Sequence, residues 1–259
     1  MSGLLGTIRH SRPVSVARYH FYRDVLLAWP RRCSCNICGW AGRRFLSYDR
    51  YRYVLCPQCG SLDRHRLIAA LLQHDAGFVR DASVDRCVLH VSPEYCLRLL
   101  LEGRARQYVR ADWATDVCDV RQDMTRMPFR SGVFDAIVCC DTLEHIPDDA
   151  AALAECHRLL KPGGTAILTV PQSDEHATRE DPSIRTDDER RRAFGQHDHV
   201  RNYGADFADR IAAAGFRVTC IDAGSFDPAL VAAHVLAPPI PLQVPWGWNR
   251  RRIYVAERT

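Results

Sequence analysis

Short apolar runs alternate with segments of helical spacing along most of the chain. The runs that predict strands are residues 84–91, 106–112, 117–123, 134–141, 165–170, 216–222 and 251–257. Between them, the apolar spacing predicts helices over 148–160 and 203–214. Strands that alternate with helices favour a parallel sheet with helices on both faces. The pattern therefore predicts an α/β fold.

The N-terminal region follows a different pattern. Residues 14–29 have apolar side chains at helical spacing, and Pro30 ends that run. Residues 33–60 are punctuated by cysteine and glycine, and residues 63–77 again predict a helix with an apolar face. We divide the chain into a helical arm, a cysteine-rich module, a linking helix and a large α/β domain, at residues 1–32, 33–66, 67–83 and 84–259.

Two later stretches interrupt the α/β pattern. Residues 171–202 are polar and charged, without a strong period. A long insertion after a sheet strand is often functional, so we expect it to form a lid over a substrate. The proline-rich stretch 238–245 predicts a loop or an extended crossover.

Composition narrows the class of protein. The chain has 259 residues, of which 47% are hydrophobic and 25% charged, which is ordinary globular usage. No apolar run reaches the roughly 18 residues of a membrane span, and the N-terminus lacks the apolar region of a secretory signal. We therefore expect no membrane span and a cytoplasmic location. The twelve cysteines are then expected to be reduced, as metal ligands or small core residues.

Charge is spread unevenly. Residues 1–66 hold twelve arginines and three aspartates, a net charge of +9, whereas the whole chain has a net charge of only +4. The basic N-terminal region suggests contact with an anionic partner. A solvated surface that is partly neutralised by the acidic remainder of the chain also explains the charge.

Two Cys-x-x-Cys-Gly knuckles indicate a zinc site. They are Cys35 with Cys38 and Cys56 with Cys59, and seventeen residues, 39–55, separate them. This spacing is typical of four-cysteine zinc modules, and each following glycine relieves a tight backbone turn. Four thiolates leave no open position for water, so we interpret the zinc as structural. The alternatives are four unrelated cysteines or a redox pair.

Basic and aromatic residues interleave between the knuckles. They are Arg43, Arg44, Tyr48, Arg50, Tyr51, Arg52 and Tyr53. Such a surface suits RNA. The same residues also suit packing against the catalytic domain, with arginine stems covering apolar surface.

Three segments together resemble the class I S-adenosylmethionine-dependent methyltransferase family, in a type 11-like domain. They are MPF at 127–129, FDAIVCCDTLEHI at 134–146 and LLKPGGTAILTVP at 159–171, and the resemblance covers about residues 84–222. It implies a doubly wound, mostly parallel seven-stranded sheet. With its cysteine knuckles, a VSPE-like first loop and GQHDHVR at 195–201, the chain looks like one subgroup of that family across nearly its whole length.

The resemblance implies where S-adenosylmethionine binds. His90, Ser92 and Glu94 stand at the exit of the first strand, where the family usually has a glycine-rich loop that this chain lacks. Glu94 is a candidate for the cofactor's ammonium group, or else a charge at a helix N-terminus. At later strand ends, the implied cofactor residues are Asp112 for the ribose, Asp123 and Met124 near the adenine, and Asp141 and Thr142 beside the sulfonium.

Four residues are candidates for the acceptor side of the site. Glu144 and His145 follow the fourth strand, and His197 and His199 lie in the polar insertion. Histidine titrates near neutral pH and so suits a base or an orienting group. Alternatively, His145 caps or packs the next helix, and His197-Asp198-His199 forms a structural cluster or a metal site. Arg201 suits an acceptor carboxylate or phosphate, or lies on the surface.

The sequence therefore predicts an S-adenosylmethionine-dependent methyltransferase with a structural zinc module. We expect O- or N-methylation of a small-molecule acceptor, such as a metabolite or a sugar-like compound. Two alternatives remain open: an RNA methyltransferase that docks nucleic acid through the zinc module, and a catalytically inactive methyltransferase-like scaffold.

Overall fold

A seven-stranded sheet forms the centre of the molecule. The computed structural model describes residues 19–27, 29–74, 86–113, 118–240 and 251–259. The strands of the central sheet are β5 (Cys87–Val91), β6 (Gln107–Asp112), β7 (Val120–Arg121), β8 (Phe134–Cys140), β9 (Leu160–Thr169), β12 (Phe216–Asp222) and β13 (Arg252–Arg258).

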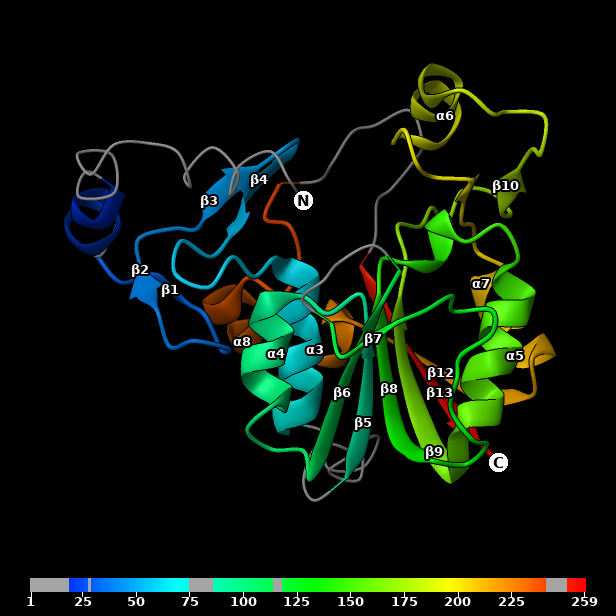
Figure 1. The fold of residues 1–259 in the computed structure, drawn as a ribbon. Coiled ribbons are helices and arrows are strands. Elements are labelled where there is room, and N and C mark those ends of the chain that lie inside the picture. Colours follow the sequence, from blue (N-terminus) through cyan, green and yellow to red (C-terminus); the bar gives the residue numbers. More distant parts are fainter. Residues whose placement is uncertain (1–18, 28, 75–85, 114–117, 241–250) are drawn as a thin grey trace.

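The strand order is β7-β6-β5-β8-β9-β13-β12 (Figure 1). Every neighbouring pair is parallel except the two that involve β13, which runs antiparallel between β9 and β12. The predicted doubly wound, mostly parallel seven-stranded fold is confirmed. The chain leaves β5 in one direction to form β6 and returns on its other side as β8, so the switch point lies between β5 and β8.

Most predicted strands form where the apolar runs lie, because buried central strands need apolar residues on both faces. Two differ. The predicted strand over 117–123 shortens to β7, because Asp123 turns the chain by accepting hydrogen bonds from the backbone N and Oγ1 of Thr125, both at 2.8 Å. β9 begins at Leu160, before the expected residue 165, and its register against β8 shifts through a bulge.

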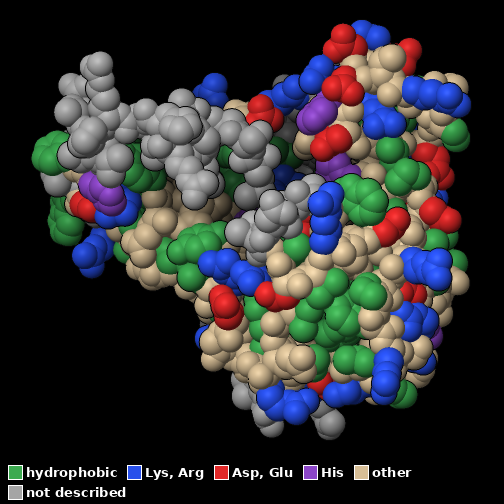
Figure 2. Space-filling view, viewed as in Figure 1, with side chains coloured by type: hydrophobic (Ala, Val, Ile, Leu, Met, Phe, Trp, Pro, Cys, Tyr) green, Lys and Arg blue, Asp and Glu red, His purple; other side chains and the backbone are tan. Residues whose placement is uncertain are grey.

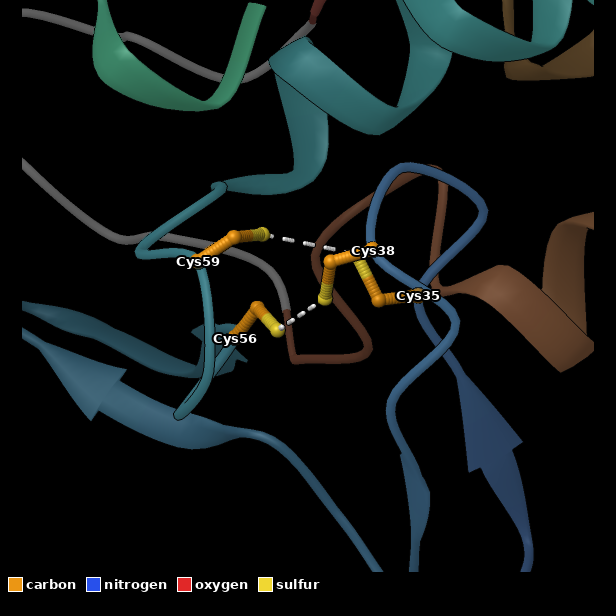
Figure 3. Close-up of side chains that lie close together, drawn as sticks. All are labelled: Cys35, Cys38, Cys56 and Cys59. Carbon is orange, nitrogen blue, oxygen red and sulfur yellow. Dashed lines mark hydrogen bonds between the residues drawn. The ribbon is translucent and has the colours of Figure 1, made fainter. Parts of the chain in front are cut away.

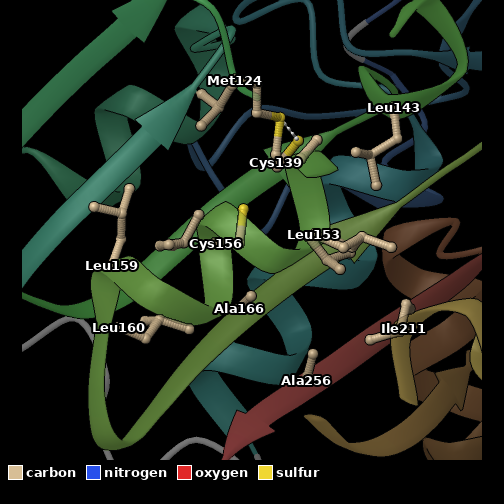
Figure 4. Packing of buried hydrophobic residues seen from close by; sticks show 14 of the residues in the cluster. Met124, Cys139, Leu143, Leu153, Cys156, Leu159, Leu160, Ala166, Ile211 and Ala256 are labelled. Carbon is tan, nitrogen blue, oxygen red and sulfur yellow. Dashed lines mark hydrogen bonds between the residues drawn. The ribbon is translucent and has the colours of Figure 1, made fainter. Parts of the chain in front are cut away.

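Helices cover both faces of the sheet (Figure 1). On one face, α3 (Asp63–His74) and α4 (Tyr95–Leu101) share a core with the inner side chains of β5 and β8. On the other, α5 (Asp149–Leu159) and α7 (Phe207–Ala213) pack against the opposite side of the same strands. Figure 4 shows part of this second core. No helix in the described residues is long and apolar enough to cross a membrane.

The cysteine-rich module is built on two small hairpins. They pair β1 (Cys33–Ser34) with β2 (Ala41–Gly42), and β3 (Leu46–Tyr48) with β4 (Tyr51–Leu55). Its buried side chains join the α3 side of the sheet in one continuous hydrophobic cluster. Before it, a five-residue π-helical turn, η1 (Tyr22–Leu26), stands within the predicted helix 14–29, whose first residues lie outside the described part.

The C-terminal side contributes a helix that the sequence pattern did not predict. After a short 3-10 turn, η3 (Ala223–Ser225), α8 (Pro228–His234) forms and contacts β1 of the cysteine-rich module. Asp227 starts α8 by accepting a hydrogen bond from the backbone N of Ala229 at 2.7 Å. The predicted loop over 238–245 lies mostly outside the described residues.

The polar insertion at 171–202 contains ordered secondary structure. It consists of β10 (Arg179–Glu180), α6 (Asp187–Phe194) and β11 (Arg201–Asn202), and β10 pairs with β11. Thr186 and Glu189 form a capping box at the start of α6, and Gly195 ends it in a left-handed conformation. In Figure 1, α6 stands above the carboxyl ends of the parallel strands.

Arg66 is fully buried and joins three parts of the chain. Its Nη1 donates to the carbonyls of Val54 and Ser61 in the cysteine-rich module, at 2.8 and 2.9 Å. Its Nε and Nη2 donate to the carbonyls of His234 and Val235 at the end of α8, at 2.7 and 2.9 Å. This arginine therefore cannot be part of a surface that meets an anion, although it contributes to the basic charge of the N-terminal region.

We expect Arg66→Met to lower the free energy of unfolding by about 3 kcal/mol or more, because two buried and two partly buried carbonyls lose their donor while the apolar volume is kept. Urea denaturation followed by circular dichroism measures the change. Arg43→Met is the matched control, because Arg43 is exposed and its replacement should leave the transition midpoint unchanged. Equal midpoints for both variants would contradict the role of Arg66.

Candidate functional site

The carboxyl ends of β5 and β8 adopt unusual backbone conformations. Ser92, directly after β5, has φ +48°, and Asp141, directly after β8, has φ +45°. A left-handed conformation is unfavourable for residues with a Cβ, and such strain gathers at functional sites. Both residues flank the switch point of the sheet, where doubly wound folds bind their ligands.

Asp141 is held by two side chains. Its Oδ2 lies 3.0 Å from Nε of Arg64, from the first turn of α3, and its Oδ1 accepts a hydrogen bond from Oγ1 of Thr169 at 2.8 Å. Burial is the largest influence and disfavours the charged carboxylate, but the charges of Arg64 and Arg251 and the hydrogen bond from Thr169 together outweigh it. The pKa of Asp141 is therefore lowered. A cation and an anion thus stand side by side at the end of β8.

The first loop is tied to α3 through Glu94. Its Oε2 lies 3.1 Å from Nε2 of His90, and its Oε1 lies 3.4 Å from Nε2 of His65. His90 is fully buried, and its Nδ1 lies 2.6 Å from the Tyr108 hydroxyl. Each oxygen of Glu94 therefore contacts a histidine, and the buried His90 links the first loop to Tyr108 of β6.

The remaining candidates for the cofactor occupy different surroundings. Asp112 is half-buried at the end of β6, and Asp123 is exposed. Thr142 donates from its Oγ1 to the carbonyl of Cys140 at 3.1 Å. Met124 points into the hydrophobic core, with its Sδ 3.8 Å from Sγ of Cys139 (Figure 4). The side chain of Met124 therefore belongs to the hydrophobic core.

Glu144, His145 and His199 come together beside the end of β8. Glu144 and His145 lie in the 3-10 turn η2 (Leu143–His145), and the rings of His145 and His199 meet edge to face, 4.8 Å apart. Burial raises the pKa of Glu144 and lowers the pKa of His199 to about 4, so its imidazole is neutral at physiological pH. His197 is exposed and reaches this group only through Asp198, at 3.7 Å.

The four knuckle cysteines converge on one point (Figure 3). Sγ of Cys35 lies 3.7 Å from Sγ of Cys59, and Sγ of Cys38 lies 3.7 Å from Sγ of Cys56. A tetrahedral zinc ion with Zn–S bonds of about 2.3 Å requires sulfur–sulfur distances of about 3.8 Å. The cluster is therefore compatible with zinc. Gly39 and Gly60 have φ +76° and +72°, as the prediction of tight knuckle turns requires.

Comparison with known proteins identifies the part of the chain around these strand ends. Residues 89–168 match a family model described as a methyltransferase domain. The chain contains a methyltransferase domain. The match runs from β5 through β9 and so includes Ser92, Asp141 and η2.

Curated relatives of the methyltransferase domain match it over a short stretch. The chain is 50% identical over 38 residues to the ubiquinone biosynthesis O-methyltransferase of Pseudomonas aeruginosa, and 50% identical over 40 residues to that of Xanthomonas oryzae. These stretches are 15% of this chain and 16% or 17% of the relatives. The chain thus spans about one sixth of the length of these relatives.

Solved structures resemble the chain over a larger part. A putative methyltransferase from Bacillus halodurans covers 72% of this chain and 99% of its own, with 17% identity and a TM-score of 0.45. The YcgJ protein from Bacillus subtilis covers 74% and 97%, with 16% identity and a TM-score of 0.48.

Arg201 joins the insertion to the methyltransferase domain. It is buried, and its guanidinium donates to the carbonyls of Leu143, Ile146 and Pro147, which surround η2. Its Nε also donates to Glu180 at 3.0 Å. Arg201 therefore does not lie on the surface, and that interpretation from the sequence was wrong. It instead fixes the turn that carries Glu144 and His145 against the segment that carries His199.

Sequence reasoning missed two residues that contact the strand ends. Arg64 entered only the count of basic charge and His65 was not singled out, yet they contact Asp141 and Glu94. The available signal was their position directly after the second knuckle, at the start of a predicted helix. A helix that starts directly after the knuckle brings its first residues to the surface on which the cysteine-rich module packs.

The surface above the strand ends is hollowed between the cysteine-rich module and the insertion (Figure 2). Histidine side chains lie on the wall of the insertion that faces this hollow, among acidic and basic groups.

Proposed function

We propose that this protein transfers a methyl group from S-adenosylmethionine to a small-molecule acceptor, at oxygen or nitrogen, in the cytoplasm. The observation that carries the proposal is the methyltransferase-domain match over residues 89–168, which contains both strained strand ends at the switch point. Ligands of doubly wound sheets bind outside these ends. The reactions of the matched relatives support the reaction class and do not fix the acceptor.

The charged groups at the end of β8 fit the amino-acid half of S-adenosylmethionine. This half is a zwitterion, with one ammonium and one carboxylate group. Asp141 and Arg64 offer the complementary pair, an anion and a cation 3.0 Å apart. We assign the ammonium to Asp141 and the carboxylate to Arg64, because these two groups stand together at the strand end that borders the switch point.

The nucleoside half fits the neighbouring strand ends. Asp112 follows β6, next to β5 in the sheet, where a carboxylate accepts both ribose hydroxyls in related folds. Asp123 lies one strand further, toward the adenine. When bound, S-adenosylmethionine supplies a methyl group on a positively charged sulfur.

The acceptor side lies on the other side of Asp141, at η2 and the insertion. Methyl transfer is an in-line displacement, so the protein mainly aligns the acceptor with the methyl group and excludes water. Neutral His199 is suited to orient an acceptor hydroxyl or amine, and the partly exposed His145 is suited to take its proton. The insertion at 171–202 acts as the lid that covers this acceptor.

The four cysteines bind a structural zinc ion that positions α3. The second knuckle ends at Gly60, and α3 begins three residues later, at Asp63. The zinc therefore fixes the helix start that carries Arg64 and His65 to the cofactor site. The sulfur–sulfur distances and the two glycine turns support this role.

RNA is the alternative acceptor, and one observation favours it. Arg43, Arg44, Arg50 and Arg52 are exposed on and beside the β3–β4 hairpin. Arg44 stacks over the ring of Tyr53, with its guanidinium carbon 4.9 Å from the ring centre. A basic and aromatic hairpin of this kind suits a nucleic-acid backbone with stacked bases.

Zinc-loaded protein should bind S-adenosylmethionine in calorimetry, and Asp112→Asn and Arg64→Gln should each weaken binding by about tenfold or more. Hydrogen bonds to charged groups are worth about 1.5–3 kcal/mol, which corresponds to such a change. Asp188→Asn, an exposed carboxylate of α6, is the control. Absence of binding by the unaltered protein would reject the proposal in favour of an inactive scaffold.

Cys38→Ser should release the zinc and lower the melting temperature, because three thiolates hold the ion less tightly than four. It should also weaken S-adenosylmethionine binding, since α3 loses the anchor that places Arg64. Elemental analysis and thermal melts measure these effects. Cys220→Ser, an exposed cysteine of β12, is the matched control. Full zinc retention in both Cys38→Ser and Cys59→Ser would remove the zinc site.

Tritiated methyl transfer to cell extract, fractionated into small molecules, RNA, protein and glycan, should label the small-molecule fraction. The combined variant Arg43→Ala, Arg44→Ala and Arg52→Ala should leave this labelling unchanged. Label in the RNA fraction that this variant and added salt abolish would instead support the RNA alternative.

A further inference from the structure

A carboxylate and two imidazoles meet where η2 contacts the insertion. One ligand atom each from Glu144, His145 and His199 lies within 4.8 Å of the others. Glu144 and His199 are only 2% and 1% exposed, whereas the His145 side chain is 33% exposed. The group is therefore enclosed by protein on one side and accessible from the other.

The partners of the two histidines favour the tautomer that has the proton on Nδ1 and the lone pair on Nε2. Nδ1 of His199 lies 3.2 Å from the carbonyl oxygen of Phe194, which can only accept a hydrogen bond. Nδ1 of His145 lies 3.3 Å from a carboxylate oxygen of Asp198. A carbonyl or carboxylate on the far nitrogen is the usual support of a metal-bound histidine.

Glu144 supplies an oxygen that lacks a partner. Its Oε2 is buried and has no hydrogen-bond partner among the described residues, while its Oε1 lies 3.9 Å from Nε2 of His145. A buried carboxylate oxygen without a partner is costly, and a cation beside it removes that cost.

The backbone holds these three side chains in place. The N–H of Val200 donates to the carbonyl of Glu144 at 2.9 Å, directly beside His199. Arg201 bonds the carbonyls on both sides of η2. The insertion and η2 are thus fixed to each other at the point where the three ligand groups meet.

We propose that Glu144, His145 and His199 bind one divalent transition-metal ion. Two imidazole nitrogens and one carboxylate oxygen suit ions such as Zn²⁺, Fe²⁺ and Co²⁺, and leave coordination positions for water or an oxygen of a bound molecule. The site differs from the four-cysteine cluster in having no sulfur ligand. The proposal that a metal binds here does not depend on the proposed function, whereas a role of the ion in holding the methyl acceptor rests on that function.

Titration of the zinc-loaded full chain with Co²⁺ tests the proposal. One equivalent should bind with weak visible absorption and without the intense near-ultraviolet bands of cobalt thiolates, which would report exchange at the cysteines. Glu144→Gln and His199→Ala should weaken Co²⁺ binding by more than the effect of Asp198→Asn, which alters only the support of His145. Loss of such a support weakens metal binding by about 10- to 100-fold.

His157→Ala is the matched control, because His157 packs on Phe216, away from the site, with ring centres 5.0 Å apart. Circular dichroism of every variant, and retained zinc at the cysteines, separate local loss of a ligand from misfolding. Absence of a second cobalt equivalent, or equal affinity in Glu144→Gln, His199→Ala and the unaltered protein, would overturn the proposal. Calorimetry with S-adenosylmethionine on the same samples distinguishes this failure from failure of the proposed function.

Discussion

The start of α3 is the constraint on which the rest of the structure depends. Four consecutive residues there, Asp63 to Arg66, point in different directions because a helix turns about 100° per residue. Asp63 lies 3.3 Å from Arg251, just before β13, and Arg64 pairs with Asp141 after β8. His65 contacts Glu94 in the first loop, and Arg66 bonds to the cysteine-rich module and α8. One helical turn thus ties the cysteine cluster to four regions of the α/β domain.

Each of these groups is charged or polar and mostly buried, so each is tolerated only because it has partners. Removing one partner costs more than the pair contributes, because the other charge stays buried. The anchors are therefore interdependent, and they begin three residues after the second knuckle ends at Gly60. This explains why a small module without catalytic groups is packed into the hydrophobic core of the sheet.

The same anchors explain how the first loop dispenses with glycine. In the family that the sequence resembles, a glycine-rich loop lets the backbone approach the cofactor, but here Ser92 adopts the left-handed conformation despite its Cβ. Its N–H donates to the carbonyl of Ala111 at 2.8 Å, and Glu94, two residues on, is held by His65 and His90. Support from α3 thus offsets a backbone strain of about 1–2 kcal/mol.

The sequence predicted the features that leave a pattern in neighbouring residues. Apolar periodicity located most strands and the main helices, and the knuckle spacing located the four cysteines that the structure brings together. It did not predict the partners of Arg64 or Arg66, because side-chain pairing across a fold has no local pattern: Arg66 and His234 are 168 residues apart. For the same reason, a surface position for Arg201 was a reasonable prediction until its three carbonyl partners were seen.

Only the fold brings the two halves of the proposed reaction together. Asp141 ends β8, and Glu144 and His145 follow within one 3-10 turn, on the side that meets the insertion. The groups proposed for the methyl donor and for the acceptor are therefore fixed to the same turn, which Arg201 and Val200 fasten from outside. In-line transfer depends on alignment within fractions of an ångström. A rigid turn shared by both halves meets that demand better than two separate loops.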